Sequence, residues 1–311
     1  MRTARRLAAL CAVLLASIAA AAEEVSIEAR GGRLYGTLER PAGDPPAVCA
    51  LLIAGAGPTD RDGNQPGLAS DSLKQLALGL TGRGLCTLRY DKRGVGASNA
   101  AAPDEHALRF DHYVADAAAW IKRLRRLDGP PRVAVVGHGE GALVALLAAQ
   151  HEGAYAAVSI AGAGRSAAFL VGEHLRGLPP ASRRRAEEIL DELAAGRLVP
   201  DIPAEFGLLF RPSVQPYLLS WFRYNPAAEI RAPGIRVLVV QGTADLQVPV
   251  AEARILAAAN PLATLTLIPD MNHVFKRCLT EADQRAAYTD PSVPIDPRVV
   301  DAIADFLLRA P

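Results

Sequence analysis

Several residue types are scarce in this sequence, and their scarcity argues against whole classes of protein. Acidic and basic side chains nearly cancel, with 34 Lys and Arg against 33 Asp and Glu and a formal net charge of +1. A chain this balanced gives no sign of a nucleic-acid partner. The four cysteines include no CxxC pair and no His/Cys cluster at ligand spacing. We therefore expect neither a structural zinc nor another bound metal.

The cysteines are also too few for a fold held together by disulfides. Cys11 lies in the N-terminal segment, which leaves Cys49, Cys86 and Cys278 in the rest of the chain. Cys49 and Cys86 stand in apolar, strand-like runs, where a free cysteine behaves as a small hydrophobic residue. We therefore predict no disulfide framework and expect both to pack as small hydrophobic side chains.

The first 22 residues have the pattern of a secretory signal. Three arginines precede an apolar run from Leu7 to Ala20, which is short for a membrane span, and Ala20-Ala21-Ala22 is typical of a cleavage site. We predict a cleaved Sec-type signal peptide, a periplasmic or secreted mature protein, and no stable membrane insertion after cleavage. An uncleaved N-terminal anchor is the alternative. A lipoprotein is disfavoured because Leu10, rather than a small residue, precedes Cys11.

Past residue 22 the hydrophobic pattern alternates between strands and helices. A hairpin is predicted where two alternating segments flank Gly31-Gly32. Short apolar runs predict strands buried on both faces, and longer amphipathic stretches predict the helices between them. The predicted strands are 47–54, 85–90, 133–136, 156–160, 237–241 and 264–268, and the predicted helices are 71–82, 111–127, the stretch after Gly141, 250–259 and 297–309.

This alternation predicts an α/β fold, a mainly parallel sheet with helices on both faces, formed by residues 23–311. Residues of about 165–228 break the pattern, because they are rich in Arg, Leu and Pro and contain no evident strand. A helical insertion there predicts a cap over the carboxyl ends of the strands, where open α/β sheets bind ligands. Its apolar side chains would either line an acyl pocket or form a core: Phe169, Leu170, Leu208, Leu209, Phe210, Tyr217, Leu218, Trp221 and Phe222.

The stretch VAVVGHGEGALVALLAAQ, residues 133–150, lacks the residue that its pattern requires. A β-branched strand, a turn with Gly137 and Gly141, and an immediate helix match the G-x-S-x-G elbow, which presents a nucleophilic serine. The middle position here is Gly139. Glycine avoids the steric strain of that turn, but it has no hydroxyl, so no acyl-enzyme can form on it.

Two other loops carry the partners that such a nucleophile would need. Asp245 follows the strand predicted at 237–241, and His273 follows the strand predicted at 264–268. Nucleophile, acid and histidine in this order is the α/β-hydrolase order, in which the histidine takes the proton and the carboxylate orients the ring. The glycine loop after residue 54 and the backbone N–H of Glu140 could together hold an oxyanion.

Four segments, AGAGPTDRDGN, RYDKRGVGAS, GHGEGA and MNHVFK, occur in this order along the chain. In them the chain from about residue 25 to its end resembles the α/β-hydrolase superfamily, most closely bacterial secreted esterases and serine-aminopeptidase-like hydrolases. The resemblance implies hydrolysis of small or medium acyl esters without a cofactor. By position it assigns Asp245 and His273 to a catalytic triad, Ala56 and Glu140 to an oxyanion hole, and the absent serine to Gly139.

No other side chain is expected to replace the nucleophile. His138 is interpreted as packing beside the turn. Cys278 follows the histidine motif, and three serines (Ser98, Ser159 and Ser166) lie on loops away from the elbow. The remaining histidines are expected to be surface or structural residues: His106, His112, His151 and His174.

Gly139 leaves three interpretations open. The chain is a pseudoenzyme that keeps its pocket to bind a ligand, or a substituted form of an active esterase, since one base change turns serine into glycine. In the third, His273 activates a water in the vacated space and hydrolysis is weak. The predicted partner is a small ester or acyl compound, and the rival class is a non-catalytic binding protein on the same fold. The oligomeric state is not predicted.

Overall fold

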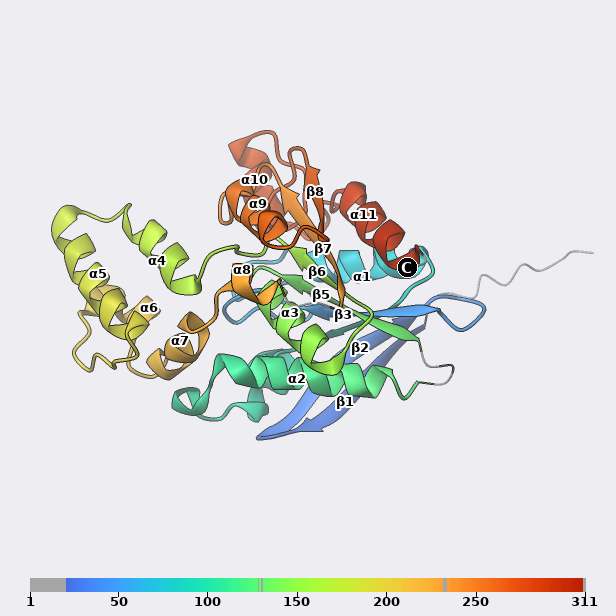
Figure 1. The fold of residues 1–311 in the computed structure, drawn as a ribbon, viewed down its shortest axis with the longest axis horizontal. Helices are drawn as coiled ribbons and strands as arrows, with labels where there is room; N and C mark the ends of the chain where they lie inside the picture. Colours follow the sequence, from blue (N-terminus) through green and yellow to red (C-terminus); the bar gives the residue numbers. More distant parts are fainter. Residues whose placement is uncertain (1–20, 128, 130, 232–233, 310–311) are drawn as a thin grey trace, which may run out of the picture.

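The computed structural model describes residues 21–127, 129, 131–231 and 234–309. These residues form an eight-stranded sheet in the order β1-β2-β4-β3-β5-β6-β7-β8 (Figure 1). The strands are β1 (Ala21–Ala29), β2 (Gly32–Arg40), β3 (Val48–Ile53), β4 (Cys86–Tyr90), β5 (Arg132–His138), β6 (Ala156–Ile160), β7 (Arg236–Gly242) and β8 (Thr264–Ile268). All six single strands and the hairpin predicted from the hydrophobic pattern are present.

The sheet is antiparallel at one edge and parallel elsewhere. β1 and β2 form the predicted hairpin, and β2 runs antiparallel to β4. The strands from β4 through β3, β5, β6 and β7 to β8 are parallel to their neighbours. β3 to β6 are buried along almost their whole length, which explains why their sequences are continuous apolar runs rather than alternating ones.

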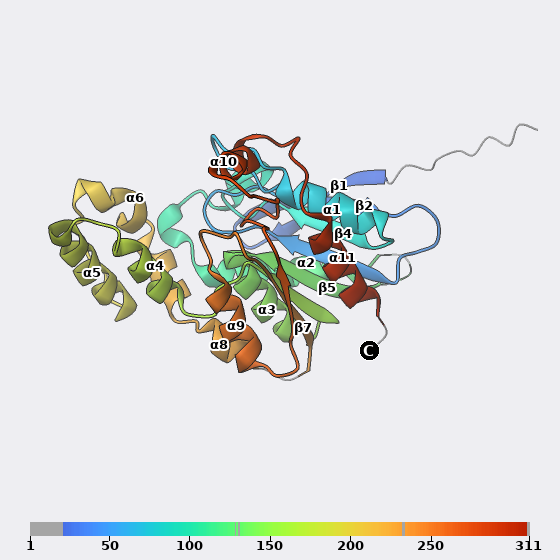
Figure 2. The ribbon, with the colours of Figure 1, turned by 90° about the horizontal axis from the view of Figure 1, so that it is seen from above.

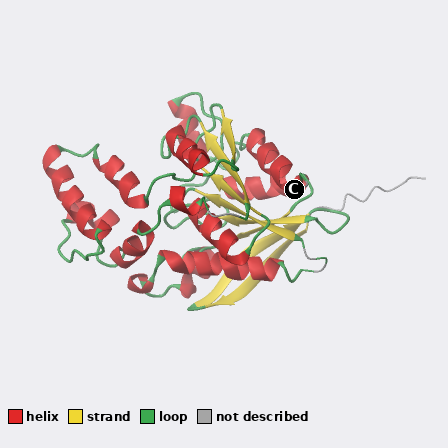
Figure 3. Ribbon diagram, viewed as in Figure 1, coloured by secondary structure: helices red, strands yellow, loops and turns green. Residues whose placement is uncertain are grey.

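Helices cover both faces of the sheet, so the predicted α/β class is confirmed (Figure 3). Leu51 and Val135 belong to the core that contains side chains of α2 (Phe110–Leu124) and α3 (Glu140–Glu152). Leu52 and Val136, one residue further along each strand, pack on the other face against α1 (Ser72–Gly82) and α11 (Pro297–Leu308). Successive strand residues point to opposite faces, so each strand contributes to both cores.

The predicted helix at 250–259 matches α9 (Val250–Ala259). α10 (Glu281–Thr289) was not predicted, because its sequence EADQRAAYT is mostly polar and only Ala287 is buried. The described residues also include three short 3₁₀ helices: η1 (Gly96–Ala101), η2 (Glu105–Ala107) and η3 (Ala204–Phe206).

Between β6 and β7 the described residues are helical and contain no strand. The helices there are α4 (Ala167–Leu175), α5 (Pro180–Ala194), α6 (Gly207–Phe210), α7 (Gln215–Phe222) and α8 (Pro226–Glu229). Figures 1 and 2 show α4, α5 and α6 standing away from the sheet, whereas α8 lies close to α9 and α3. This segment borders the site described below.

Cys49 and Cys86 are joined by a disulfide, so the expectation that they pack as free cysteines is wrong. β3 and β4 are neighbouring parallel strands, and their register places these two residues opposite each other with 4.3 Å between the Cα atoms. Neither residue is exposed, so the disulfide lies within the core. Cys278 is free and buried.

The predicted signal peptide falls almost entirely outside the described residues. Only Ala21 and Ala22 are described, and they pair with Arg40 and Glu39 as the first residues of β1. Within the described ranges, no helix is both long enough and apolar enough to cross a bilayer.

Candidate active site

The turn between β5 and α3 is a tight elbow with Gly139 at its tip. Gly139 has φ 56° and ψ −117°, a combination that residues with a side chain rarely adopt. Glycine is required on both sides of it, because a Cβ at Gly137 would lie 2.0 Å from the carbonyl oxygen of Gly141, and a Cβ at Gly141 would lie 2.6 Å from that of Ala54. The elbow therefore depends on these two glycines for its packing.

Gly139 itself has room for a side chain. A Cβ built there would have Nε2 of His273 as its nearest neighbour, at 3.6 Å, and Cα of Gly55 next, at 3.8 Å. A hydroxyl oxygen one bond beyond that Cβ could reach hydrogen-bond distance of Nε2. The His273 ring thus faces the position where the family pattern places a serine side chain.

His273 is oriented by Asp245. The Nδ1 atom of His273 lies 2.9 Å from Oδ2 of Asp245, which also accepts a hydrogen bond from the side-chain amide of Gln241 at 3.0 Å. The other oxygen, Oδ1, accepts from the backbone N–H groups of Gln247 and Val248 at 2.8 and 2.9 Å. Burial acts to raise the pKa of Asp245, but the hydrogen bond and electrostatic attraction of His273, together with the two backbone N–H groups, outweigh burial and hold the pKa below its ordinary value.

Two backbone N–H groups border the same space. Glu140 is the first residue of α3, so its N–H has no intrahelical partner, and Ala56 lies in the loop after β3. Neither N–H donates a hydrogen bond to any of the described residues, and both residues line the pocket that contains Gly139. The structure therefore brings together all five site residues that the sequence analysis named.

His138 packs beside the elbow, as the sequence analysis expected. Its ring is buried, and its centroid lies 4.5 Å from that of His273 and 4.8 Å from that of Phe275. Burial, reinforced by His273, lowers the pKa of His138 to about 3, so the ring is neutral near pH 7. Its Nε2 atom is buried without a hydrogen-bond partner among the described residues.

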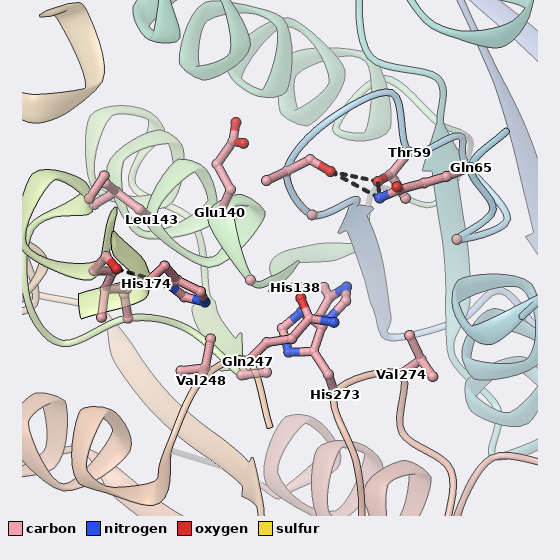
Figure 4. Close-up of a pocket in the computed structure, with 18 of the residues that line it drawn as sticks. Thr59, Gln65, His138, Glu140, Leu143, His174, Gln247, Val248, His273 and Val274 are labelled. Carbon is pink, nitrogen blue, oxygen red and sulfur yellow. Dashed lines mark hydrogen bonds between the residues drawn. The ribbon is translucent and has the colours of Figure 1, made fainter. Parts of the chain in front are cut away.

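The pocket has a volume of about 510 Å³ and two sides (Figure 4). Thr59 and Gln65, from the loop after β3, form one side. Leu143 and His174 lie on the other, toward the helical segment, with His138 and His273 between the two sides (Figure 4). A cavity of this size with a mixed lining suits a small organic ligand.

Few of the apolar residues that the sequence offers as an acyl-pocket lining reach the pocket. Of its nine apolar and aromatic residues named above, only Leu170 and Trp221 line the pocket. Phe210 and Tyr217 are buried in the core instead, and Leu208 is 90% exposed. The hydrophobicity of these residues does not predict which of them face the cavity and which face the core.

The remaining histidines, Cys278 and the three serines differ in whether they line the pocket. His174 is exposed, as expected of a surface residue, and it also lines the pocket. No signal in the sequence distinguishes it from His106, His112 and His151, which do not line the pocket. Cys278 packs beside Val274 and Ala287 outside the pocket lining, and none of the three named serines lines the pocket. Among the described residues, no group of three or more His, Cys, Asp or Glu is placed to hold a metal ion.

These features place the chain in a known class of protein. The alpha/beta hydrolase family matches residues 50–289, and the chain belongs to this family. Among characterised proteins, esterase EstD of Thermotoga maritima is 26% identical over 295 residues, which span 92% of this chain and 68% of that protein.

Solved esterase structures share the fold. The ferulic acid complex of Est1E from Butyrivibrio proteoclasticus has a TM-score of 0.63 and 18% identity, over 91% of this chain and 98% of that one. The malate-bound thermophilic esterase from Thermogutta terrifontis has a TM-score of 0.57 and 18% identity, over 92% and 98% of the two chains. At these identities the likeness is one of fold.

Proposed function

We propose that this protein carries the site of a carboxylic-ester hydrolase that lacks only its nucleophile. One observation carries the proposal: the Asp245–His273 pair is aligned on the Cβ position of Gly139, with Nε2 3.6 Å away. The similarity to an esterase over 92% of the chain supports the same reaction class. As it stands, the protein is expected to be inactive or very weak toward esters.

The proposed roles follow from the geometry. An ester carbonyl over Gly139 would direct its oxygen to the N–H groups of Ala56 and Glu140, which would stabilise the negative charge that forms during attack. With a serine at position 139, His273 would accept the hydroxyl proton and then protonate the departing alcohol, while Asp245 keeps the ring oriented. With glycine, a water is the available nucleophile, and His273 could accept its proton.

Restoring the nucleophile tests the proposal. Gly139→Ser should raise hydrolysis of p-nitrophenyl acetate or butyrate at least about 10³-fold over the unaltered protein, given what loss of the serine costs such enzymes. The same variant should be labelled by a fluorophosphonate probe, which reacts with an activated serine. Adding His273→Ala should abolish most of both gains.

Controls separate catalysis from background. Gly139→Ala changes the same position without adding a hydroxyl, and it should show neither hydrolysis nor labelling. A folded Gly139→Ser protein that cleaves no short ester and takes up no probe would contradict the proposal, and would favour a pseudohydrolase that binds a small ligand. The preserved pocket of about 510 Å³ is the observation that supports this second function.

We also propose that the chain is exported to the periplasm or secreted. The Cys49–Cys86 disulfide supports this proposal, because structural disulfides persist mainly in oxidising compartments. N-terminal sequencing of the protein from a cell fraction outside the cytoplasm should give a start near Glu23. A protein recovered in the cytoplasm with Met1 retained would contradict it.

A further inference from the structure

The segment Arg89-Tyr90-Asp91-Lys92-Arg93 spans the end of β4 and the residues after it, and it is not part of the proposed chemistry. Three of its charged side chains nevertheless reach the loop of residues 55–64, here called the oxyanion loop. Arg89 donates to Asp62 at 2.7 Å, and Asp91 accepts from the backbone N–H of Arg61 at 2.8 Å. Lys92 donates from Nζ to the carbonyl oxygen of Gly57 at 3.2 Å and to that of Gly55.

Lys92 is the unusual member of this group. It is only 1% exposed, and the hydrogen bonds that its ammonium group makes within the described ranges go to backbone carbonyl oxygens rather than to a carboxylate. Its other neighbour is the ring of Tyr113, whose centroid lies 5.0 Å from Nζ. Burial lowers the pKa of Lys92, and the nearby charge of Glu140 opposes that effect. A buried cation is costly unless it is well bonded, so these carbonyl contacts are its main compensation.

The two carbonyl groups that Lys92 binds flank Ala56. In a trans peptide the C=O and the following N–H point in opposite directions. The Gly55–Ala56 peptide is trans, since the described residues contain no cis bond. The Gly55 carbonyl points into the protein interior, where it accepts a hydrogen bond from the buried Nζ of Lys92. The N–H of Ala56 therefore points in the opposite direction, toward the pocket that Ala56 lines.

The next peptide group is held as well. The carbonyl oxygen of Ala56 accepts hydrogen bonds from Oγ1 of Thr59 at 2.7 Å and from the side-chain amide of Gln65 at 3.3 Å. These contacts come from within the loop region itself. Lys92, the second residue after β4, holds the Gly55 carbonyl from outside the loop and so connects the Gly55–Ala56 peptide group to the sheet.

We propose that Lys92 is a positioning residue that aims the Ala56 N–H at the oxyanion of the substrate. This inference rests on the proposed function, because it assumes that an oxyanion forms over Gly139. Lys92 touches no reacting atom. It acts through the Gly55–Ala56 peptide group, and its loss should affect the transition state more than substrate binding.

The first test needs no catalysis and uses the unaltered protein. Butylphosphonate, whose oxygens resemble an oxyanion, is titrated while the backbone amide signals of Ala56 and Glu140 are followed by NMR. Both signals should shift in the unaltered protein. In Lys92→Met only the Glu140 signal should respond, and Lys92→Arg, which keeps a donor, should restore part of the Ala56 response.

Arg93→Met is the matched control. Arg93 is buried in the same segment, but its guanidinium pairs with Asp116 and donates to the carbonyl of Arg30, away from the oxyanion loop. This variant should be destabilised while both amide signals still respond. An Ala56 signal that responds equally in the unaltered protein and in Lys92→Met, or that fails alike in Lys92→Met and Arg93→Met, would overturn the inference.

The second test uses the Gly139→Ser background. Adding Lys92→Met should lower kcat about 10²-fold with less than about threefold change in KM, as expected for loss of an oxyanion-hole donor. Adding Arg93→Met should change kcat less than about threefold. Equal kcat losses in the two variants would refute the role of Lys92. If Gly139→Ser itself is inactive, the proposed function fails, while the amide titration still decides whether Lys92 orients Ala56.

Discussion

Giving position 139 any side chain should cost stability, whether or not activity returns. The backbone there has φ 56° and ψ −117°. Sparsely populated backbone conformations of this kind cost about 1–3 kcal/mol for a residue with a Cβ. The space around the Cβ adds little, because the nearest atom would be 3.6 Å away, an ordinary contact distance.

The magnitude can be stated for a thermal melt. The entropy of unfolding is about 2.1 cal/mol/K per residue, so for 311 residues 1 kcal/mol shifts Tm by about 1.5 °C. Gly139→Ser and Gly139→Ala should therefore each lower Tm by about 1.5–5 °C. The two should agree within about 1 °C, because the strain comes from the Cβ that they share. Differential scanning calorimetry of both variants and of the unaltered protein measures this fall in Tm.

Gly82→Ser provides a control for the introduction of serine as such. Gly82 ends α1, has no positive φ, and has nothing within 4 Å of a Cβ position, so this variant should change Tm by less than about 1 °C. Unchanged melting of both variants at position 139 would show that the elbow is not strained. A large loss in Gly139→Ser alone would place the cost in the hydroxyl rather than the backbone.

Three further outcomes are expected. In the Gly139→Ser background, Trp221→Ala should move the preferred p-nitrophenyl ester toward longer acyl chains, because Trp221 lines the pocket; a fall in Tm with unchanged preference would assign it to the core instead. His138 titrates near pH 6.5 when unfolded and at about 3 when folded, so below pH 6.5 only the unfolded chain takes up its proton and stability falls by about 1.4 kcal/mol per pH unit. Urea unfolding at pH 7 and pH 5 should therefore differ by about 2 kcal/mol more in the unaltered protein than in His138→Phe, and equal differences would contradict this. Thiol titration of the denatured, unreduced protein should detect Cys278 but neither Cys49 nor Cys86, and reaction of all three would exclude the disulfide.

Much of this fold is predictable from local pattern. β3 and β5 are buried on both faces of the sheet, so their sequences are short apolar runs. A strand of this kind can therefore be predicted from its composition alone. α10 escapes the same reasoning, since a helix that buries only Ala287 carries almost no hydrophobic periodicity. The Cys49–Cys86 disulfide cannot be predicted from local pattern for another reason. Their contact depends on which strands are neighbours and in what register, and residues 37 apart in sequence do not reveal that.

The candidate site divides in the same way. Asp245 and His273 were identifiable because each follows a strand, and parallel strands end at one edge of the sheet. The sequence does not mark Lys92 as a site residue, because a lysine in a sequence suggests an exposed charge. Its proposed role rests on its burial and on its hydrogen bonds to two carbonyl groups, and both depend on the folded structure.

The elbow alone says little about chemistry, because packing explains its glycines. Gly137 and Gly141 lie too close to backbone atoms for any Cβ, so they would be needed even if the turn carried no function. The Asp245–His273 pair is a more specific feature. The Asp245 carboxylate is nearly buried and accepts four hydrogen bonds, one of them from the ring of His273. Because that ring faces the Cβ position of Gly139, the pair supports the proposed function more directly than the elbow does.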